Sequence, residues 1–306
     1  MFDGVINIYK EPGFTSNDVV IKMRGIFHMK KIGHTGTLDP AAEGVLPVCL
    51  GKATKLVSML TDETHKTYQA VMLLGQVTDT QDTTGQVTAS ADVDEMIRSG
   101  TLTEEAVRSA AASFIGDYAQ IPPMYSALKV NGKRLYELAR EGKEVERAAR
   151  PVHIYDLTVD SIALPRVTMT VTCSRGTYIR TLCHDIGEKL GCGGCMEHLL
   201  RTKVGNFAVD RAIRLGELET LAREGRAEEA VIPIDGILAD LPAVCSENEI
   251  LDRLLDNGNP FGAEFLDPTG YGDDAEVRMY DGQGRFIGVY GYRPDEKKWK
   301  AVRIFK

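Results

Sequence analysis

A single aspartate lies in the glycine-rich stretch of residues 30–55. The glycines nearest to it are Gly33, Gly36 and Gly44, which permit tight or left-handed backbone. The proline after Asp39 biases this residue away from helical dihedrals, so the loop can present one carboxylate at the head of a cleft. The alternative is that Asp39 only caps a turn or the next helix, as most Asp-Pro pairs do.

Two other chemistries fit the sequence less well. The glycine-rich stretch lacks the Gly-Lys-Ser/Thr ending of a phosphate-binding loop. Cys192 and Cys195 form a Cys-x-x-Cys pair with Cys183 and His184 nearby, but a structural zinc site usually needs two well-spaced pairs. We therefore expect no metal site, and we expect the cysteines to be thiols.

The overall charge excludes one class of nucleic-acid binder. The formal net charge of the 306-residue chain is −8, whereas proteins that coat nucleic acid nonspecifically depend on a strong positive field. Local basic groups could still bind a polyanion. They are Lys22, Arg24, Lys30 and Lys31, and a stretch between 129 and 150 that also contains four glutamates and could equally be a solvated helix face.

The N-terminal residues and the apolar segments predict a cytoplasmic protein. No basic segment, long apolar run or small-residue cleavage site marks a signal peptide, and no apolar stretch reaches the roughly 18–20 residues of a membrane span. We expect no membrane partner.

Periodicity predicts an alternation of strands and helices. Strands are expected at 5–10, 65–75, 152–164 and 166–174, and helices at 16–28 (capped by Thr15 or Ser16), 52–60, 103–115 and 176–191 (ending at Gly187 or Gly191). Residues 120–150 lack such a pattern and are expected to form an inserted excursion. From about 247 onward we expect short strands and glycine turns, with a hairpin at Asp281-Gly282.

Five stretches in a fixed order resemble a known family, the bacterial tRNA pseudouridine synthases of the TruB type. They are GVINIYKEPGFTSND (4–18), GHTGTLDPAAEGVLPVCLGKATK (33–55), the run from KTYQA to TDTQDTTG (66–85), IPPMYSALKVNGKRLYELAREG (121–142) and CSRGTYIRTLCHDIGEKLG (173–191). Together they span most of residues 4–207, so a chance match is implausible.

The resemblance implies an α+β fold built on a pseudouridine-synthase-like mixed, mainly antiparallel sheet with flanking helices. It implies a catalytic domain at 1–240, with an RNA-gripping insertion at about 120–150. The tail at 247–306 resembles a small β domain of the PUA-like, RNA-binding type.

The resemblance also implies an activity, the isomerisation of uridine 55 in the T-loop of tRNA to pseudouridine by base flipping. Asp39 corresponds to the catalytic aspartate, which attacks the ribose or assists its deprotonation, and Arg180 would pair with it. Tyr68 would stack on the flipped uracil. The remaining residues implied for the base pocket are His34, Tyr178, Leu199 and, with less support from its motif, Asp82.

This chemistry needs one ionised carboxylate and no redox step, metal or phosphate donor, so we expect no cofactor. An aspartate side chain is an anion at neutral pH, and a neighbouring arginine orients it. Extruding the base costs a few kcal/mol, and stacking on an aromatic ring returns roughly 1–3 kcal/mol. The expected partner is tRNA, through its T-loop and acceptor arm.

Two alternatives come from other classes of protein. One is an RNA-binding or tRNA-folding chaperone that uses the same cleft without catalysis, and a folding role could also accompany the enzyme. The other is a guide-RNA-dependent relative that works inside a multiprotein particle. The basic insertion and the absence of lysine-rich tails favour the stand-alone bacterial type, without a guide RNA. A monomer is the default expectation.

Overall fold

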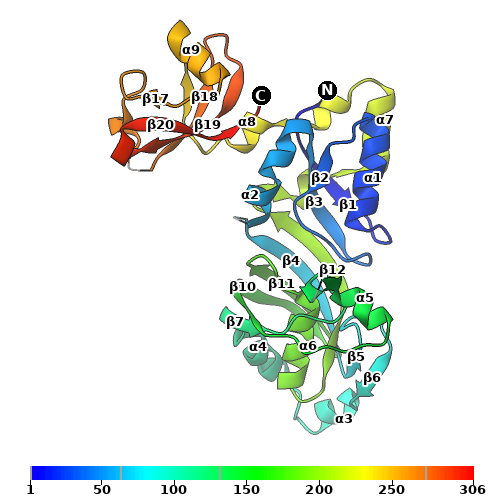
Figure 1. Cartoon of the computed structure of the whole chain (residues 1–306). Coiled ribbons are helices and arrows are strands. Elements are labelled where there is room, and N and C mark those ends of the chain that lie inside the picture. Colours follow the sequence, from blue (N-terminus) through cyan, green and yellow to red (C-terminus); the bar gives the residue numbers. More distant parts are fainter. Residues whose placement is uncertain (1, 63, 131, 273) are drawn as a thin grey trace.

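The structure is a computed structural model that describes residues 2–62, 64–130, 132–272 and 274–306. Within these ranges the chain forms one large sheet, one five-stranded sheet near the C-terminus and two short hairpins (Figure 1). No helix among the described residues is long and apolar enough to cross a membrane.

The large sheet contains eleven strands of the described chain. Its strands are β1 (Gly4–Lys10), β2 (Ile32–His34), β3 (Glu43–Leu50), β4 (Lys66–Leu74), β7 (Gly116–Gln120), β10 (Arg150–Ala163), β11 (Arg166–Cys173), β12 (Gly194–Val204), β13 (Phe207–Ala208), β14 (Ile213–Arg214) and β15 (Ile232–Pro233). The main path runs β14-β1-β3-β12-β4-β11-β10-β7. Only β1 with β14 and β3 with β12 pair in parallel among these strands. The sheet is therefore mixed and mainly antiparallel, as expected.

The helices that accompany this sheet lie on both of its faces. They are α1 (Ser16–Phe27), η1 (Gly51–Leu56), α2 (Val57–Asp62), α3 (Val93–Arg98), α4 (Glu104–Ala112), α6 (Ile179–Lys189), η2 (Val209–Arg211), α7 (Leu215–Arg223), η3 (Ala227–Ala230) and α8 (Ile234–Ile237). α1 and α7 pack on one face of β1 and β3, and η1 and α2 pack on the other. α4 and α6 cover the inner face of β4, β10 and β11.

Helix α1 illustrates how local sequence sets an element. Thr15 accepts a hydrogen bond from the backbone of Asp18 and Asp18 reaches back to Thr15, which makes a capping box. Four apolar residues at helical spacing form its buried stripe: Val19, Val20, Met23 and Phe27. The helix ends at His28, which adopts the left-handed conformation (φ 50°). This element matches the expectation closely.

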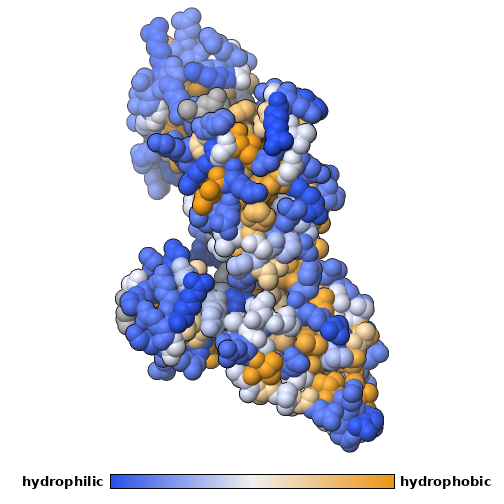
Figure 2. Space-filling model, turned by 90° about the vertical axis from the view of Figure 1, so that its right-hand side faces the viewer, coloured by the Kyte–Doolittle hydropathy of each residue, from blue (hydrophilic) through white to orange (hydrophobic). Residues whose placement is uncertain are grey.

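The insertion starts and ends on neighbouring strands. Arg150 of β10 pairs with Gln120 of β7, so the intervening excursion leaves the sheet and returns to the same edge. It contains β8 (Lys129–Val130), β9 (Lys133–Arg134) and α5 (Leu135–Arg140). In the side view of Figure 2 a mainly hydrophilic lobe projects from the body at about the height of α5 in Figure 1.

The C-terminal part forms the five-stranded sheet in the order β16-β18-β19-β20-β17. Its elements are β16 (Ala243–Cys245), α9 (Glu249–Asp256), β17 (Phe261–Gly262), η4 (Pro268–Gly270), β18 (Glu276–Tyr280), β19 (Phe286–Arg293), η5 (Pro294–Glu296) and β20 (Lys298–Ile304). The two hairpins elsewhere are β8 with β9, and β5 (Gln76–Thr78) with β6 (Val87–Ser90).

Three expectations need correction. The helix expected at 52–60 is a 3₁₀ turn followed by α2, which ends at Asp62. The C-terminal part contains the helix α9, capped by Asn248, which the expectation of short strands and turns overlooked. Of the two glycines expected to end the helix at 176–191, Gly191 (φ 73°) directly follows the C-cap of α6, as expected. The helix runs through Gly187, where a Cβ atom would lie 2.3 Å from the Gly193 backbone, so that glycine serves close packing.

Candidate active site

Asp39 lies in the loop between β2 and β3, and its side chain is 39% exposed. The loop is tied to the start of α1: the Leu38 amide donates to Ser16 Oγ (2.9 Å), and the Gly13 amide donates to the Pro40 carbonyl (2.8 Å). The carbonyl of Asp39 accepts from the Ala42 amide, which closes a turn. The backbone of Asp39 thus closes the turn, and its carboxylate is not needed for it.

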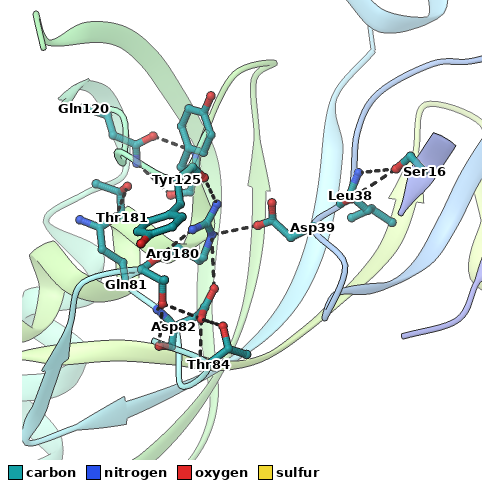
Figure 3. Close-up of polar contacts among 12 residues, drawn as sticks. Ser16, Leu38, Asp39, Gln81, Asp82, Thr84, Gln120, Tyr125, Arg180 and Thr181 are labelled. Atoms are coloured by element: carbon teal, nitrogen blue, oxygen red, sulfur yellow. Dashed lines mark hydrogen bonds and ion pairs between the residues drawn. The ribbon is translucent and has the colours of Figure 1, made fainter. Parts of the chain in front are cut away.

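The carboxylate of Asp39 points to Arg180, as Figure 3 shows. Asp39 Oδ2 lies 2.8 Å from Nε of Arg180, whose side chain is buried. The other two guanidinium nitrogens donate to backbone carbonyls, Nη1 to Thr80 and Nη2 to Tyr125, each at 2.8 Å. Arg180 therefore joins the Asp39 loop, the turn after β5 and the start of the insertion. Its guanidinium is fixed on all three sides.

Asp82 lies beside the same guanidinium, at 3.8 Å from Nε of Arg180. Its other oxygen, Oδ1, accepts hydrogen bonds from Thr80 Oγ1 (2.8 Å) and from the backbone and hydroxyl of Thr84. The side chain is 14% exposed, less than that of Asp39. Asp39 is thus the more accessible of the two carboxylates that face Arg180.

Helix α6 places Arg180 through its first turn. Its N-cap, Tyr178, has no capping side chain, and Gln120 of β7 binds the backbone of Tyr178 on both sides. Gln120 Oε1 accepts from the Tyr178 amide (2.7 Å), and Nε2 donates to the Tyr178 carbonyl (3.0 Å). The root of the insertion therefore holds both Tyr178 and the helix that carries Arg180. Burial raises the pKa of Tyr178, so its phenol stays protonated at neutral pH.

Tyr68 and Leu199 belong to the apolar cluster beneath Asp39. Both are nearly buried, at 7% and 6% exposure, and they pack in one cluster with Leu38, the neighbour of Asp39. Burial raises the pKa of Tyr68, while the nearby Arg201 opposes that rise. The structure places both residues in the core cluster that also contains Leu38, with little of the Tyr68 side chain exposed.

His34 stands apart from the Asp39–Arg180 pair. It ends β2, and its Nδ1 accepts a hydrogen bond from the Gly36 amide (3.3 Å). Burial, and then the charge of Arg201, lower its pKa, so the ring is neutral at pH 7. Among the hydrogen bonds and ion pairs of the described residues, none joins His34 to Asp39 or Arg180.

Two buried cations that sequence reasoning missed support the Asp39 loop. Lys10, at the end of β1, is fully buried and donates to the carbonyls of Glu11, Phe14 and Pro40. Burial lowers its pKa to about 8, and the carboxylate of Asp39 opposes that effect. A lysine at the end of a strand is usually a surface residue. In the sequence, only the position of Lys10 in the stretch 4–18 that resembles the family could have indicated its role.

Arg201 of β12 supports the loop from the other side. It is 1% exposed, and it donates to the carbonyls of Val45 (2.7 Å), Gly36 (3.3 Å) and Thr37 (3.4 Å). Gly44 lies against its backbone: with φ at +107°, a Cβ there would sit 2.2 Å from the Arg201 carbonyl oxygen. The close β3–β12 approach thus requires glycine at this position.

The cysteines of the Cys-x-x-Cys pair are buried thiols. Cys183, Cys192 and Cys195 are free, and burial raises the pKa of each. Within the part of the chain that the structure describes, no group of three or more His, Cys, Asp or Glu side chains could hold a metal ion.

Solved structures of known proteins share this fold. A Cbf5-Nop10-Gar1 complex gives a TM-score of 0.70 at 27% identity, covering 99% of this chain and 85% of the matched one. An H/ACA RNP bound to a substrate RNA containing 2′-deoxyuridine gives 0.69 at 25% identity, with the same coverage.

Sequence relatives are more similar. Proteins named tRNA pseudouridine synthase B are 43% identical in Alkaliphilus oremlandii (99% of this chain, 98% of the relative) and 45% identical in Lachnoclostridium phytofermentans (99% of both). The family model for the N-terminal domain of TruB family pseudouridylate synthases matches residues 24–179, and the model for the tRNA pseudouridylate synthase B C-terminal domain matches 180–244. The resemblance noted in the sequence is confirmed, and the chain belongs to the TruB family of pseudouridylate synthases.

Proposed function

We propose that this protein isomerises uridine 55 in the T-loop of tRNA to pseudouridine, with Asp39 as the catalytic residue. The observation that carries the proposal is the contact between Asp39 and Arg180, in which a half-exposed carboxylate meets a buried guanidinium at 2.8 Å. The relatives named tRNA pseudouridine synthase B, at 41–49% identity, support tRNA as the substrate.

The reaction needs an oriented anion at the ribose. Asp39 serves as a nucleophile at C1′ or as a base toward a ribose proton, and both roles use the ionised carboxylate. The N1–C1′ bond breaks, the uracil rotates, and a C5–C1′ bond forms while C5 loses a proton and N1 gains one. Atoms and charge balance without a cofactor. Arg180 keeps the carboxylate aimed because its own guanidinium is held by Thr80 and Tyr125.

The flipped base would rest on the apolar cluster below Asp39. Tyr68 stacks on the uracil, and Tyr178, Leu199, His34 and Asp82 line the pocket. Since only 7% of Tyr68 is exposed, its neighbours move apart as the base enters. Stacking then returns roughly 1–3 kcal/mol against an extrusion cost of a few kcal/mol.

We infer that one chain of this protein acts alone, without a guide RNA, on tRNA gripped through its T-loop and acceptor arm. Residues 1–240 form the catalytic domain, in which the insertion at 120–150 grips RNA, and residues 247–306 bind RNA as a PUA-like domain. Higher identity to the tRNA enzymes than to the Cbf5 complexes supports the stand-alone form. A tRNA substrate agrees with a cytoplasmic location, and a tRNA-folding role is compatible with the same grip.

The test uses the full chain and an unmodified tRNA transcript tritiated at uracil C5, with EDTA present. We expect tritium release and a pseudouridine that maps to the T-loop position. Tight binding of tRNA without release would contradict the proposal and favour a chaperone or a guide-dependent relative. Release that occurs without EDTA and is lost in its presence would contradict the cofactor-free mechanism.

A further inference from the structure

A basic surface follows α1 and the turn that leads into β2. We define it by Lys22, Arg24, His28, Lys30 and Lys31, all of them exposed. Residues 19–38 contain no aspartate or glutamate, although the chain has 44 acidic residues among 306. At that frequency about three would be expected in twenty positions. The segment is therefore locally positive in a protein whose net charge is −8.

The cations of the basic surface are unpaired. Among the ion pairs of residues 2–62, 64–130, 132–272 and 274–306, none includes Lys22, Arg24, Lys30 or Lys31. Lys22 has one other contact, with its ammonium 4.8 Å from the centre of the Phe14 ring. Unpaired cations keep their counterions in solution and can exchange them for phosphates.

The basic stretch of the insertion differs in this respect. Glu141 pairs with both Lys133 and Lys143, and Glu144 pairs with Arg147. Three of the seven lysines and arginines between 129 and 150 are thus paired. The surface along α1 differs because no ion pair of the described residues involves any of its four lysines and arginines.

A cavity of about 340 Å³ opens in this surface at the end of α1. Its lining residues are Asp3, His28, Met29, Lys30, Lys31, Gly51 and Lys52. The one carboxylate in the lining, that of Asp3, already accepts from the Lys52 amide (2.6 Å) and lies 3.5 Å from the Lys52 ammonium. Because the Asp3 carboxylate contacts Lys52, Lys30 and Lys31 are the lysines of the lining that remain to bind a ligand.

The basic surface leads away from the candidate active site. Ser16, the first residue of α1, hydrogen-bonds the backbone of Leu38 beside Asp39. Twelve residues of helix span about 18 Å, so the far end of the surface lies roughly one helix length from that contact. Figure 1 shows α1 on the outer side of the large sheet, beside α7 and β1.

We propose that this basic surface binds the sugar-phosphate backbone of the same tRNA whose uridine enters the Asp39 site. The proposal rests on the proposed function, because it takes tRNA as the substrate. Phosphate contacts fix the register of a nucleic acid without reading its sequence. The RNA would be held in place during base extrusion by Lys22, Arg24, Lys30 and Lys31. These residues contribute to affinity and take no part in the chemistry.

The experiment compares tRNA affinity across salt concentrations for the parent and the double variant Lys30→Gln/Lys31→Gln. We expect the Kd to rise by about tenfold and the slope of log K against log salt to become shallower by about 2, roughly one unit for each lost phosphate contact. The rate at saturating tRNA stays unchanged, because neither lysine contacts Asp39 or Arg180. A second variant, Lys22→Gln/Arg24→Gln, tests the other end of the surface.

The matched control removes two paired charges elsewhere, Arg98→Gln/Arg226→Gln. Arg98 pairs with Glu95, and Arg226 pairs with Glu224 and Glu229, so their loss should leave the Kd and the salt slope at the parent values. Parent-like slopes in both surface variants, with the fold verified by circular dichroism, would overturn the inference. Failure of the parent to release tritium would instead overturn the proposed function, since tRNA affinity is measured separately.

Discussion

Four buried cations surround the loop that carries Asp39: Lys10, Lys66, Arg180 and Arg201. Of these four side chains, only Arg180 has carboxylates of the described residues within ion-pair distance. The other three donate to backbone carbonyls, which offsets the cost of burying them. The hydrogen bonds of Lys10 and Arg201 hold the Asp39 loop, whereas Lys66 donates to Thr61 and Thr64 outside it. Sequence motifs identified Asp39 and Arg180 because their types define the chemistry. Lys10 and Arg201 were missed because their roles depend on burial and on carbonyls distant in sequence.

Lys10 predicts an alkaline limit to activity. Burial lowers its pKa from 10.5 to about 8, so above that pH it becomes a neutral amine with two N–H donors for three carbonyls. The rate of tRNA conversion at saturating substrate should therefore fall as the pH rises through about 8. In Lys10→Arg, which keeps its charge, the fall should move out of the measured range.

Stability should respond to Lys10 in the opposite direction. Below pH 8 the folded protein holds a proton that burial disfavours, and between about 8 and 10.5 the unfolded chain binds more protons. The contribution of Lys10 to stability therefore rises with pH in this window. For the activity, a conversion rate that falls at the same pH in the parent and in Lys10→Arg would show that a group other than Lys10 causes the fall.

At the scale of elements, strands and helices with regular apolar periods were predictable: β1, α1, β4, α4, β10 and β11. Strand β3 was not identified, because it is an apolar run without alternation that Pro47 interrupts, and its long-range pairing with β1 overrides the proline. Strand β12 contains Glu197, His198 and Arg201, and a buried arginine in mid-strand cannot be anticipated from local sequence. The missed elements are the central ones that position the site.

Gly44 provides a test of the β3–β12 contact. An alanine there would have to adopt φ near +107° and place Cβ 2.2 Å from the Arg201 carbonyl oxygen. We expect Gly44→Ala to lower the free energy of unfolding by about 2 kcal/mol or more, measured by urea denaturation.

Gly25 is the matched control for this substitution. It lies in α1 with nothing within 4 Å of an added Cβ, so Gly25→Ala should stabilise the protein by about 0.5–1 kcal/mol. Equal effects of the two substitutions would contradict the close approach of β12 to Gly44.

At the scale of the whole molecule, one apolar cluster joins the C-terminal sheet to the large sheet. Val289 and Phe305 pack in the same cluster as Val5 of β1 and Leu60 of α2. Arg278 binds the connecting segment by donating to the carbonyls of residues 235, 239 and 241. Its guanidinium therefore has a structural role. Such contacts between distant segments leave no local sequence pattern.

A substitution of Phe305 tests how strongly this apolar cluster joins the two sheets. It is 4% exposed, so we expect Phe305→Ala to lower the free energy of unfolding by about 3–5 kcal/mol. Val302 of β20 is 41% exposed and is the control, and Val302→Ala should change the free energy of unfolding by less than about 0.5 kcal/mol. If both variants unfold at the same urea concentration, the C-terminal sheet is not held through this cluster.

The central claim is that the Asp39 carboxylate performs the chemistry on a tRNA uridine. The most direct measurement is the single-turnover rate of tritium release from C5-labelled tRNA by the parent and by Asp39→Asn, with the tRNA Kd of both proteins measured in parallel. The account predicts a rate lower by at least about 1,000-fold in Asp39→Asn, with the Kd within about threefold of the parent. An Asp39→Asn protein that binds tRNA normally and releases tritium within about tenfold of the parent rate would contradict it.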